Sequence, residues 1–254
     1  MTDPRQSVIV TGGTSGIGLS IAHRLIADGW AVLLTGRSAE QGEQALAELG
    51  DHAAFAQVDH AEADAPDAVL ARHAQLDPAR FGPIAGLVNN VGRRHNDLIG
   101  EHTAERLAET MALNVTASIL MTQAVVPALR ERGGGSIVNM SSRLAVIGMH
   151  GVSGYSATKA ALNGFTVAAA IELAPDRIRV NAVAPGMTKT ALIEAWLADQ
   201  PDPAAAEHAQ SSAVPLGRLT APEDVAHAVS YLVSDGASYI TGTVLPVDGG
   251  YTAA

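Results

Sequence analysis

The chain has 254 residues, of which 47% are hydrophobic and 17% are charged, and it contains no cysteine. The lack of cysteine excludes disulfides, thiol nucleophiles, iron–sulfur clusters and Cys-ligated zinc. Lys+Arg 16 against Asp+Glu 26 gives a formal net charge of −10, which repels nucleic-acid phosphates and anionic lipids. We therefore expect a soluble globular protein that binds neither nucleic acid nor a membrane surface.

Short β-rich runs alternate with longer Ala-rich helical runs along the chain. The expected strands are Ser7–Thr11, Ala31–Thr35, Phe55–Val58, Gly86–Asn89, Ser136–Asn139, Arg179–Val183 and Thr243–Pro246. The expected helices are Ile17–Asp28, Glu40–Leu49, Pro66–Gln75, Ala104–Leu129, Ser156–Leu173 and Glu223–Ser234. Strands joined by helix-length crossovers predict an α/β fold, a Rossmann-like doubly wound parallel sheet flanked by helices. No linker or repeat divides the chain, so residues 1–254 are expected to form a single domain.

The turn after the first expected strand reads Thr-Gly-Gly-Thr-Ser-Gly-Ile-Gly over Thr11–Gly18. Glycines let a backbone turn sharply and approach a pyrophosphate, and the following helix N-terminus supplies N–H groups and a positive dipole. Glycines after a strand also occur in plain turns, but the strand–turn–helix context favours phosphate binding. The residues expected to hold a dinucleotide here are Gly12, Thr14, Ser15, Gly16, Ile17 and Gly18.

The end of the second strand favours NADP(H) over NAD(H). No carboxylate follows that strand until Glu40, whereas an NAD-selective site would place an acidic side chain on the ribose hydroxyl. Arg37 is placed to bind a 2′-phosphate, and Ser38 adds a hydroxyl. The alternative is a solvent-exposed arginine, which leaves NAD(H) open. At the third strand, Asp59 is expected to bind the adenine amino group, beside His60, unless it is a plain loop aspartate.

Two helical stretches, Met111–Leu129 and Ser156–Ala174, are apolar on more than one face, which favours self-association over a crowded core. The first stretch contains amides, hydroxyls and a proline, too many polar groups for a membrane span. The apolar run Val8–Val10 is too brief for a signal peptide, so a cytoplasmic location is expected.

Ser142, Tyr155 and Lys159 are the candidate catalytic group. Tyr155 and Lys159 are four residues apart on one expected helix, hence on one face. A tyrosine pKa near 10 is too high for proton transfer at neutral pH, and a nearby ammonium lowers it. Ser142 follows a strand at the carboxyl edge of the sheet, where its hydroxyl can hold a substrate carbonyl. A lone Tyr-x-x-x-Lys is more often a surface pair, so the surrounding motifs decide.

Those motifs extend over about residues 7–250. They are the turn Thr11–Gly18, Asn89-Asn90-Val91-Gly92, Asn114, Asn181-Ala182-Val183-Ala184-Pro185-Gly186 and Val247-Asp248-Gly249-Gly250. Together with Ser142 and Tyr155–Lys159, in this order and spacing, they resemble the short-chain dehydrogenase/reductase family. The resemblance implies that Tyr155 is the general acid/base and that Lys159 binds the nicotinamide ribose and depresses the tyrosine pKa. It also implies that Ser142 polarises the carbonyl and that Asn114 holds a water in a proton relay.

The resemblance extends to the cofactor and the assembly. Asn90, Val91 and Gly92 would flank the adenosine ribose, and Val91, where the family usually has Ala, is a conservative departure. The resemblance also places Pro185 and Gly186 at the nicotinamide face. It places Thr188 near the carboxamide and Thr190 near the pyrophosphate. It implies a homotetramer, or a homodimer, built through the two apolar helices and the C-terminal segment.

Substrate choice is less clear from the sequence. The segment 188–216 is longer than an ordinary connection, so we expect a substrate lid, with a surface insertion as the alternative. Arg93, Arg94 and His95 would meet an anionic substrate or cofactor phosphates, or form an exposed loop rim. Neighbours of the catalytic positions are expected to line the pocket: Arg143, Leu144, Met149, His150, Met187 and Trp196. The other histidines lack ligand spacing, so no metal site is expected.

These observations favour an NADP(H)-dependent oxidoreductase that reduces a ketone or 3-oxoacyl-type carbonyl to a secondary alcohol. A small-molecule alcohol or sugar dehydrogenase acting oxidatively with NAD(P) is the alternative, because the same residues serve both directions. A non-catalytic dinucleotide-sensing protein is a third reading, from a different functional class. It is disfavoured because both Tyr155 and Lys159 are present.

Overall fold

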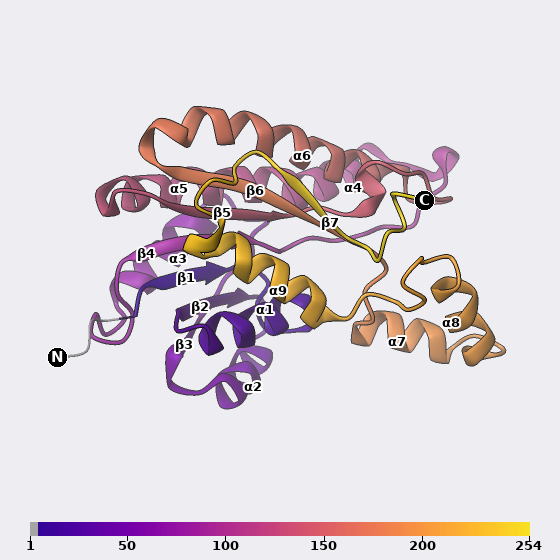
Figure 1. Cartoon of the computed structure of the whole chain (residues 1–254), viewed down its shortest axis with the longest axis horizontal. Coiled ribbons are helices and arrows are strands. Elements are labelled where there is room, and N and C mark those ends of the chain that lie inside the picture. Colours follow the sequence, from indigo (N-terminus) through magenta and orange to yellow (C-terminus); the bar gives the residue numbers. More distant parts are fainter. Residues whose placement is uncertain (1–4) are drawn as a thin grey trace.

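The computed structural model describes residues 5–254, and their sheet has seven parallel strands in the order β3-β2-β1-β4-β5-β6-β7 (Figure 1). This confirms the predicted Rossmann-like α/β fold. The strands are β1 Ser7–Val10, β2 Ala31–Gly36, β3 Ala53–Gln57, β4 Ile84–Asn89, β5 Gly135–Met140, β6 Ile178–Pro185 and β7 Val244–Val247. Each strand starts and ends within two residues of its predicted bounds. Residues 1–4 of the predicted domain lie outside the described residues.

Helices cover both faces of the sheet. They are α1 Gly16–Ala27, α2 Ala39–Leu49, α3 Ala65–Ala74, α4 Ala104–Met111, α5 Ala117–Arg132, α6 Ser153–Leu173, α7 Ala191–Ala198, α8 Pro203–Ser211 and α9 Pro222–Val233. One apolar cluster joins α3, α5 and α6 to the sheet, and a second joins α1, α2 and α9 to it, as the two layers in Figure 1 show. In β1, Ile9 belongs to the first cluster, whereas Val8 and Val10 belong to the second. Because a strand alternates its side chains and both faces are covered, the strand sequence is apolar throughout.

The predicted helix Ala104–Leu129 is not one continuous α-helix. A π-helical turn, Ala112–Thr116, separates α4 from α5. Such turns are rare and occur mostly at functional sites. By length and composition alone the whole run Ala104–Arg132 could cross a membrane, but half of its most apolar window is buried inside the structure. It is weak evidence for a span, because the core helix of a soluble protein passes the same test.

The segment 188–216 contains two helices that the sequence reading did not predict, α7 and α8. In Figure 1 they stand away from the body of the sheet, at the end toward which the strand arrows point. The carboxyl ends of all seven parallel strands meet at that edge, where doubly wound folds bind ligands.

Candidate active site

The turn between β1 and α1 has the geometry of a phosphate cradle. Gly12 and Gly16 have φ values of +62° and +53°, a region that L side chains rarely adopt. A Cβ on Gly18 would press into the carbonyl oxygen of Gly12 and lie 2.6 Å from Nδ2 of Asn90. Ser15 precedes α1 without making a side-chain cap, so no side chain occupies the N–H groups of the first turn. The turn therefore fits a pyrophosphate, which would accept those N–H groups.

Residues after β4 fix this turn in place. The Thr11 hydroxyl accepts hydrogen bonds from the backbone N–H groups of Asn90, at 2.9 Å, and Val91, at 3.1 Å. The Asn90 amide in return donates to the carbonyl oxygens of Thr11, at 3.0 Å, and Gly12, at 2.9 Å. Asn90 and Val91 thus lie against the glycine turn, as a cofactor-flanking role requires.

At the end of β2, Arg37 is exposed, and its side chain makes no hydrogen bond or ion pair with residues 5–254. A Cβ on Gly36 would lie 3.0 Å from Oγ1 of Thr14, which brings this strand end beside the glycine turn. The Ser38 hydroxyl accepts from the Gln41 N–H at 3.2 Å and so caps α2. Arg37 is therefore free to bind a phosphate, while Ser38 already has a structural partner.

His60 is buried and forms a 2.6 Å hydrogen bond between its Nε2 and Oγ1 of Thr35. Burial lowers its pKa to about 4, which the charge of Asp59 only partly offsets. Oδ1 of Asp59 accepts from the Ala61 N–H at 3.0 Å and so stabilises its own loop. His60 is thus neutral at physiological pH, and its hydrogen bond to Thr35 holds the end of β2 in place.

Two of the four predicted catalytic residues, Asn114 and Lys159, lie around Gly92, and a third, Tyr155, lies beside Lys159. A Cβ on Gly92 would lie 3.2 Å from Oδ1 of Asn114 and 3.5 Å from Nζ of Lys159. Lys159 donates from Nζ to the carbonyl oxygen of Met140 at 2.7 Å, and Nζ lies 5.7 Å from the centroid of the Tyr155 ring. The sequence thus folds strand ends and helices so that these polar groups converge at the carboxyl edge of the sheet.

Asn114 is fully buried in the π-helical turn. Its Oδ1 accepts from the Arg93 N–H at 2.7 Å, and its Nδ2 donates to the Arg93 carbonyl at 2.9 Å and to Oγ1 of Thr158 at 3.0 Å. Both ends of the amide are therefore engaged by protein groups. The side chain therefore holds the loop after β4 against α6.

Burial affects the ionisation of both Tyr155 and Lys159. Burial raises the pKa of the Tyr155 phenol, and a hydrogen bond with Ser142 and the charge of Arg94 oppose that shift. Burial also lowers the pKa of Lys159 to about 8, so the amine is still mainly an ammonium at neutral pH. Burial thus acts against the depression of the tyrosine pKa that was expected from Lys159, and that depression stays a prediction.

Arg143 and Leu144, directly after Ser142, are both buried beside it. The Leu144 N–H donates to the Ser142 hydroxyl at 3.1 Å, and the Arg143 guanidinium lies 3.9 Å from the centroid of the Tyr251 ring. The sequence analysis did not place Tyr251 in the site. Its signal was the closing motif ending at Gly250, which brings the next residue to this edge.

The remaining predicted substrate residues spread outward. His95 contacts Arg106 at 3.2 Å rather than a catalytic group. Arg94 is exposed but near enough for its charge to act on Tyr155. The Met187 carbonyl accepts from the Thr220 N–H at 3.1 Å. Three of the predicted pocket residues are exposed: Met149, His150 and Trp196.

The predicted lid is attached at its base. Thr188 pairs with Thr220, and Lys189 forms a 2.7 Å ion pair with Glu207 of α8. The Cγ2 of Thr190 would lie 3.6 Å from a Cβ on Gly16, which places Thr190 over the glycine turn. Thr190 therefore lies beside the glycine turn, and the roles of Thr188 and Thr190 toward a cofactor stay predictions.

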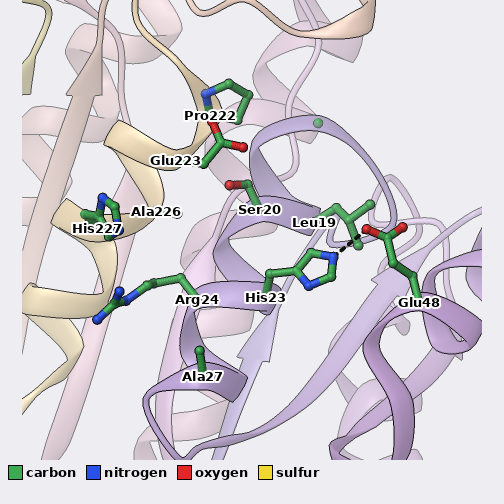
Figure 2. Close-up of a pocket in the computed structure, with 11 residues that line it drawn as sticks. Leu19, Ser20, His23, Arg24, Ala27, Glu48, Pro222, Glu223, Ala226 and His227 are labelled. Carbon is green, nitrogen blue, oxygen red and sulfur yellow. Dashed lines mark hydrogen bonds and ion pairs between the residues drawn. The ribbon is translucent and has the colours of Figure 1, made fainter.

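Two hollows lie outside the catalytic cluster. A pocket lies between α1 and α9, where His23 of α1 and Glu48 of α2 form a 2.5 Å hydrogen bond (Figure 2), and its volume is about 420 Å³. A second hollow, of about 530 Å³, lies between residues 215–224 and 245–250. Neither is lined by Ser142, Tyr155 or Lys159, so we assign neither to the reacting group. Within residues 5–254, no group of three acidic or histidine side chains is placed to hold a metal ion.

Comparison with known proteins identifies the family. A family model described as enoyl-(acyl carrier protein) reductase matches residues 12–252. A 3alpha-hydroxysteroid dehydrogenase from Mediterraneibacter gnavus is 39% identical over 243 residues, which cover 95% of this chain and 94% of the relative. A cyclopentanol dehydrogenase from a Comamonas species is 38% identical over 253 residues, which cover 97% and 96%.

Solved structures agree. That of a short chain dehydrogenase/reductase family protein matches with a TM-score of 0.86 and 36% identity, over 99% of this chain and 100% of that chain. The chain therefore belongs to the short-chain dehydrogenase/reductase family, as an NAD(P)-dependent oxidoreductase that acts on the CH–OH or C=O group of a small molecule.

Proposed function

We propose that this chain reduces a ketone to a secondary alcohol with NADPH, and that Tyr155 donates the proton. The observation that carries the proposal is the convergence of the Tyr155 ring and the buried amine of Lys159 at the carboxyl edge of the sheet. Nζ of Lys159 lies 5.7 Å from the ring centroid, and Ser142 is near enough to act on the phenol. The two relatives act, by their names, on a hydroxysteroid and on cyclopentanol. We therefore take a ring-borne carbonyl as the first substrate class, and a 3-oxoacyl compound as the second.

The cofactor fits the residues present. The glycine turn and the first turn of α1 would hold the pyrophosphate, and the free Arg37 side chain would bind the 2′-phosphate. Asn90, Val91 and Gly92 would flank the adenosine ribose, with Pro185, Gly186, Thr188 and Thr190 on the nicotinamide side. When bound, the nicotinamide supplies or accepts the hydride.

Side chains of the protein supply and stabilise the proton that is transferred. Because burial raises the pKa of Tyr155, the phenol is protonated at neutral pH, and this is the form that carbonyl reduction needs. Ser142 holds the carbonyl oxygen next to the phenol, so that the oxygen receives the proton as it gains negative charge. Lys159 carries a positive charge below its pKa of about 8 and so stabilises that oxygen and the phenolate that remains.

Steady-state reduction of cyclopentanone and cyclohexanone by NADPH tests this proposal. Replacement of Tyr155 by Phe keeps the ring and removes the proton, so we expect kcat to fall about 10³-fold. NADPH affinity should change little. For the unaltered chain, kcat/KM for reduction should fall above about pH 8, as Lys159 loses its charge. Retained turnover in Tyr155→Phe would contradict the assigned role. NADPH binding without turnover on any ketone would favour the sensing protein instead.

The oxidative direction is a second candidate, because both relatives are named as dehydrogenases of alcohols. Oxidation needs the phenolate of Tyr155, whose raised pKa makes that form scarce at neutral pH. Rates with cyclopentanol and NADP⁺ should therefore rise with pH while reduction rates fall. Oxidation that exceeds reduction at neutral pH would overturn the preferred direction.

We also propose a homotetramer, with a homodimer as the smaller alternative. Met111, Val167 and Ile171 expose apolar side chains within the two stretches that the sequence singles out, Ile171 to 73%, and Leu107 of α4 is exposed one turn before Met111. Light scattering should report the oligomer for the unaltered chain and a smaller species for Ile171→Glu. A monomer at all concentrations would contradict the proposal. A cytoplasmic location stays a prediction, testable by cell fractionation.

A further inference from the structure

Arg143 is a buried arginine whose hydrogen-bond donors have no protein acceptor. It directly follows Ser142 and is only 9% exposed, yet among residues 5–254 no carbonyl or carboxylate accepts from its guanidinium. A guanidinium has five N–H donors, and none of the Arg143 nitrogens is among the fully buried side-chain atoms that lack a partner, so its donors stay open to solvent or to a ligand. The half-buried Arg179 shows the usual solution, donating to the carbonyls of Leu232, Val233 and Ser234 at 2.6–3.1 Å.

The surroundings hold Arg143 in place without using its donors. Its guanidinium lies over the Tyr251 ring, an arrangement that fixes the plane of the group by a cation–π contact. The buried carboxylate of Asp248 is close enough for its charge to act on Arg143. However, Asp248 accepts instead from the N–H groups of Gly250 and Thr252, at 3.0 Å each, and from the Thr252 hydroxyl at 2.6 Å. Its charge therefore helps Arg143 to remain buried while the N–H donors stay free.

The cofactor phosphates are poorly placed to take these donors. The predicted phosphate-binding groups follow β1 and β2, whereas Arg143 follows β5. In the order β2-β1-β4-β5, two strand spacings separate β1 from β5, or about 10 Å, and three separate β2 from β5, or about 14 Å. Arg143 is instead one residue from Ser142, which the proposed function assigns to the substrate carbonyl.

We infer that Arg143 binds a carboxylate of the substrate, so that the physiological substrate is an oxo acid or its hydroxy acid. This inference rests on the proposed function for the position of the carbonyl. The planar fork of a guanidinium matches the two oxygens of a carboxylate and gives two parallel charge-assisted hydrogen bonds. Arg94, whose charge reaches Tyr155, adds positive potential on the side of the loop after β4 and draws an anion into the site.

A matched pair of ketones tests the inference. 4-Oxocyclohexanecarboxylate and 4-methylcyclohexanone share a ring and a carbonyl, and differ in the charged group. We expect the unaltered chain to prefer the acid by about tenfold or more in kcat/KM, and Arg143→Met to lower that preference by about ten- to hundredfold. Arg143→Lys should keep part of the preference, because it keeps the charge and loses the fork. Arg177→Met, which removes an exposed charge at the opposite edge of the sheet, is the control and should leave the preference intact.

Binding separates this inference from the proposed function. Calorimetry with cyclohexanecarboxylate, which has no carbonyl to reduce, should show binding to the unaltered chain in the presence of NADPH and weaker binding to Arg143→Met. If that holds while no ketone is turned over, the carboxylate site stands and the proposed reaction falls. If Arg143→Met lowers the acid and the neutral ketone equally, or does not weaken cyclohexanecarboxylate binding, Arg143 only anchors the C-terminal segment and the inference is overturned.

Discussion

The two ends of the site are built differently. At the cofactor end, backbone groups of the glycine turn lie between β1 and α1 and are tied to the loop after β4 by four hydrogen bonds of Thr11 and Asn90. At the substrate end, α7 and α8 stand away from the sheet (Figure 1), and Leu192 of α7 is 77% exposed. The Thr188–Thr220 pairing and one ion pair hold the base of that segment.

This contrast indicates that affinity for the dinucleotide and selectivity for the substrate depend on different kinds of structure. A dinucleotide is bound largely by backbone N–H groups, so its site requires glycines at fixed positions and a rigid frame. A substrate is recognised by side chains on segments that can differ without disturbing the sheet. Changes at the cofactor end should therefore affect stability and nucleotide binding together, whereas changes at the substrate end should affect KM alone.

The largest effect is expected for Gly18→Ala. The added methyl group meets the Gly12 carbonyl and the Asn90 amide, both of which are fixed by hydrogen bonds. We expect the free energy of unfolding, measured in urea, to fall by about 2–4 kcal/mol, and NADPH binding to weaken markedly. Gly100→Ala in the exposed turn Ile99–Glu101 is the control, because no other side chain or backbone of residues 5–254 lies within 4 Å of its added Cβ, and it should be neutral or stabilising. Equal behaviour of the two variants would contradict the rigid cofactor end.

The next effect concerns His60 and acid stability. Its folded pKa of about 4 lies below the ordinary 6.5, so the unfolded chain binds the proton more readily. The stability that His60 contributes is present in full above pH 6.5 and is lost as the pH falls toward 4. Between neutral pH and about pH 4.5 the loss should be about 2–3 kcal/mol. In His60→Gln, urea unfolding should show a smaller pH dependence, and an unchanged dependence would refute this account.

The smallest effect is expected at the substrate end. Lys189→Ala breaks a solvent-exposed ion pair with Glu207, so the free energy of unfolding should hardly change. A looser lid should raise the KM for the ketone a few-fold, and Glu207→Gln should reproduce the change. Weaker NADPH binding in both variants would show that α7 and α8 belong to the cofactor end, and the contrast would then fail.

The sequence predicted the features that depend on short-range chemistry. The turn Thr11–Gly18 and the i, i+4 pair Tyr155–Lys159 carry their geometry in their spacing, and alternating strand and helix patterns define the parallel sheet. The strand ends were predicted closely, because glycines and polar residues bound the apolar runs.

What the sequence left out depends on tertiary packing. The π-helical turn around Asn114 follows from contacts with Arg93 and Thr158, which no local pattern encodes. The raised pKa of Tyr155 reflects burial, which the positive charge of Lys159 alone does not predict. Likewise, Tyr251 contacts Arg143, which is far from it in the sequence. The helices α7 and α8 are short and contribute few residues to the core, so their apolar pattern does not reveal them in the sequence.

A fluorescence titration of the purified chain with NADPH and, separately, with NADH tests the central claim most directly. The free guanidinium of Arg37 at the end of β2 should make NADPH bind about tenfold or more tightly than NADH, and Arg37→Ala should abolish that difference. NADH binding as tightly as NADPH would mean that Arg37 is only a surface side chain. The cofactor assignment would then be contradicted, together with the preference for reduction that is built on it.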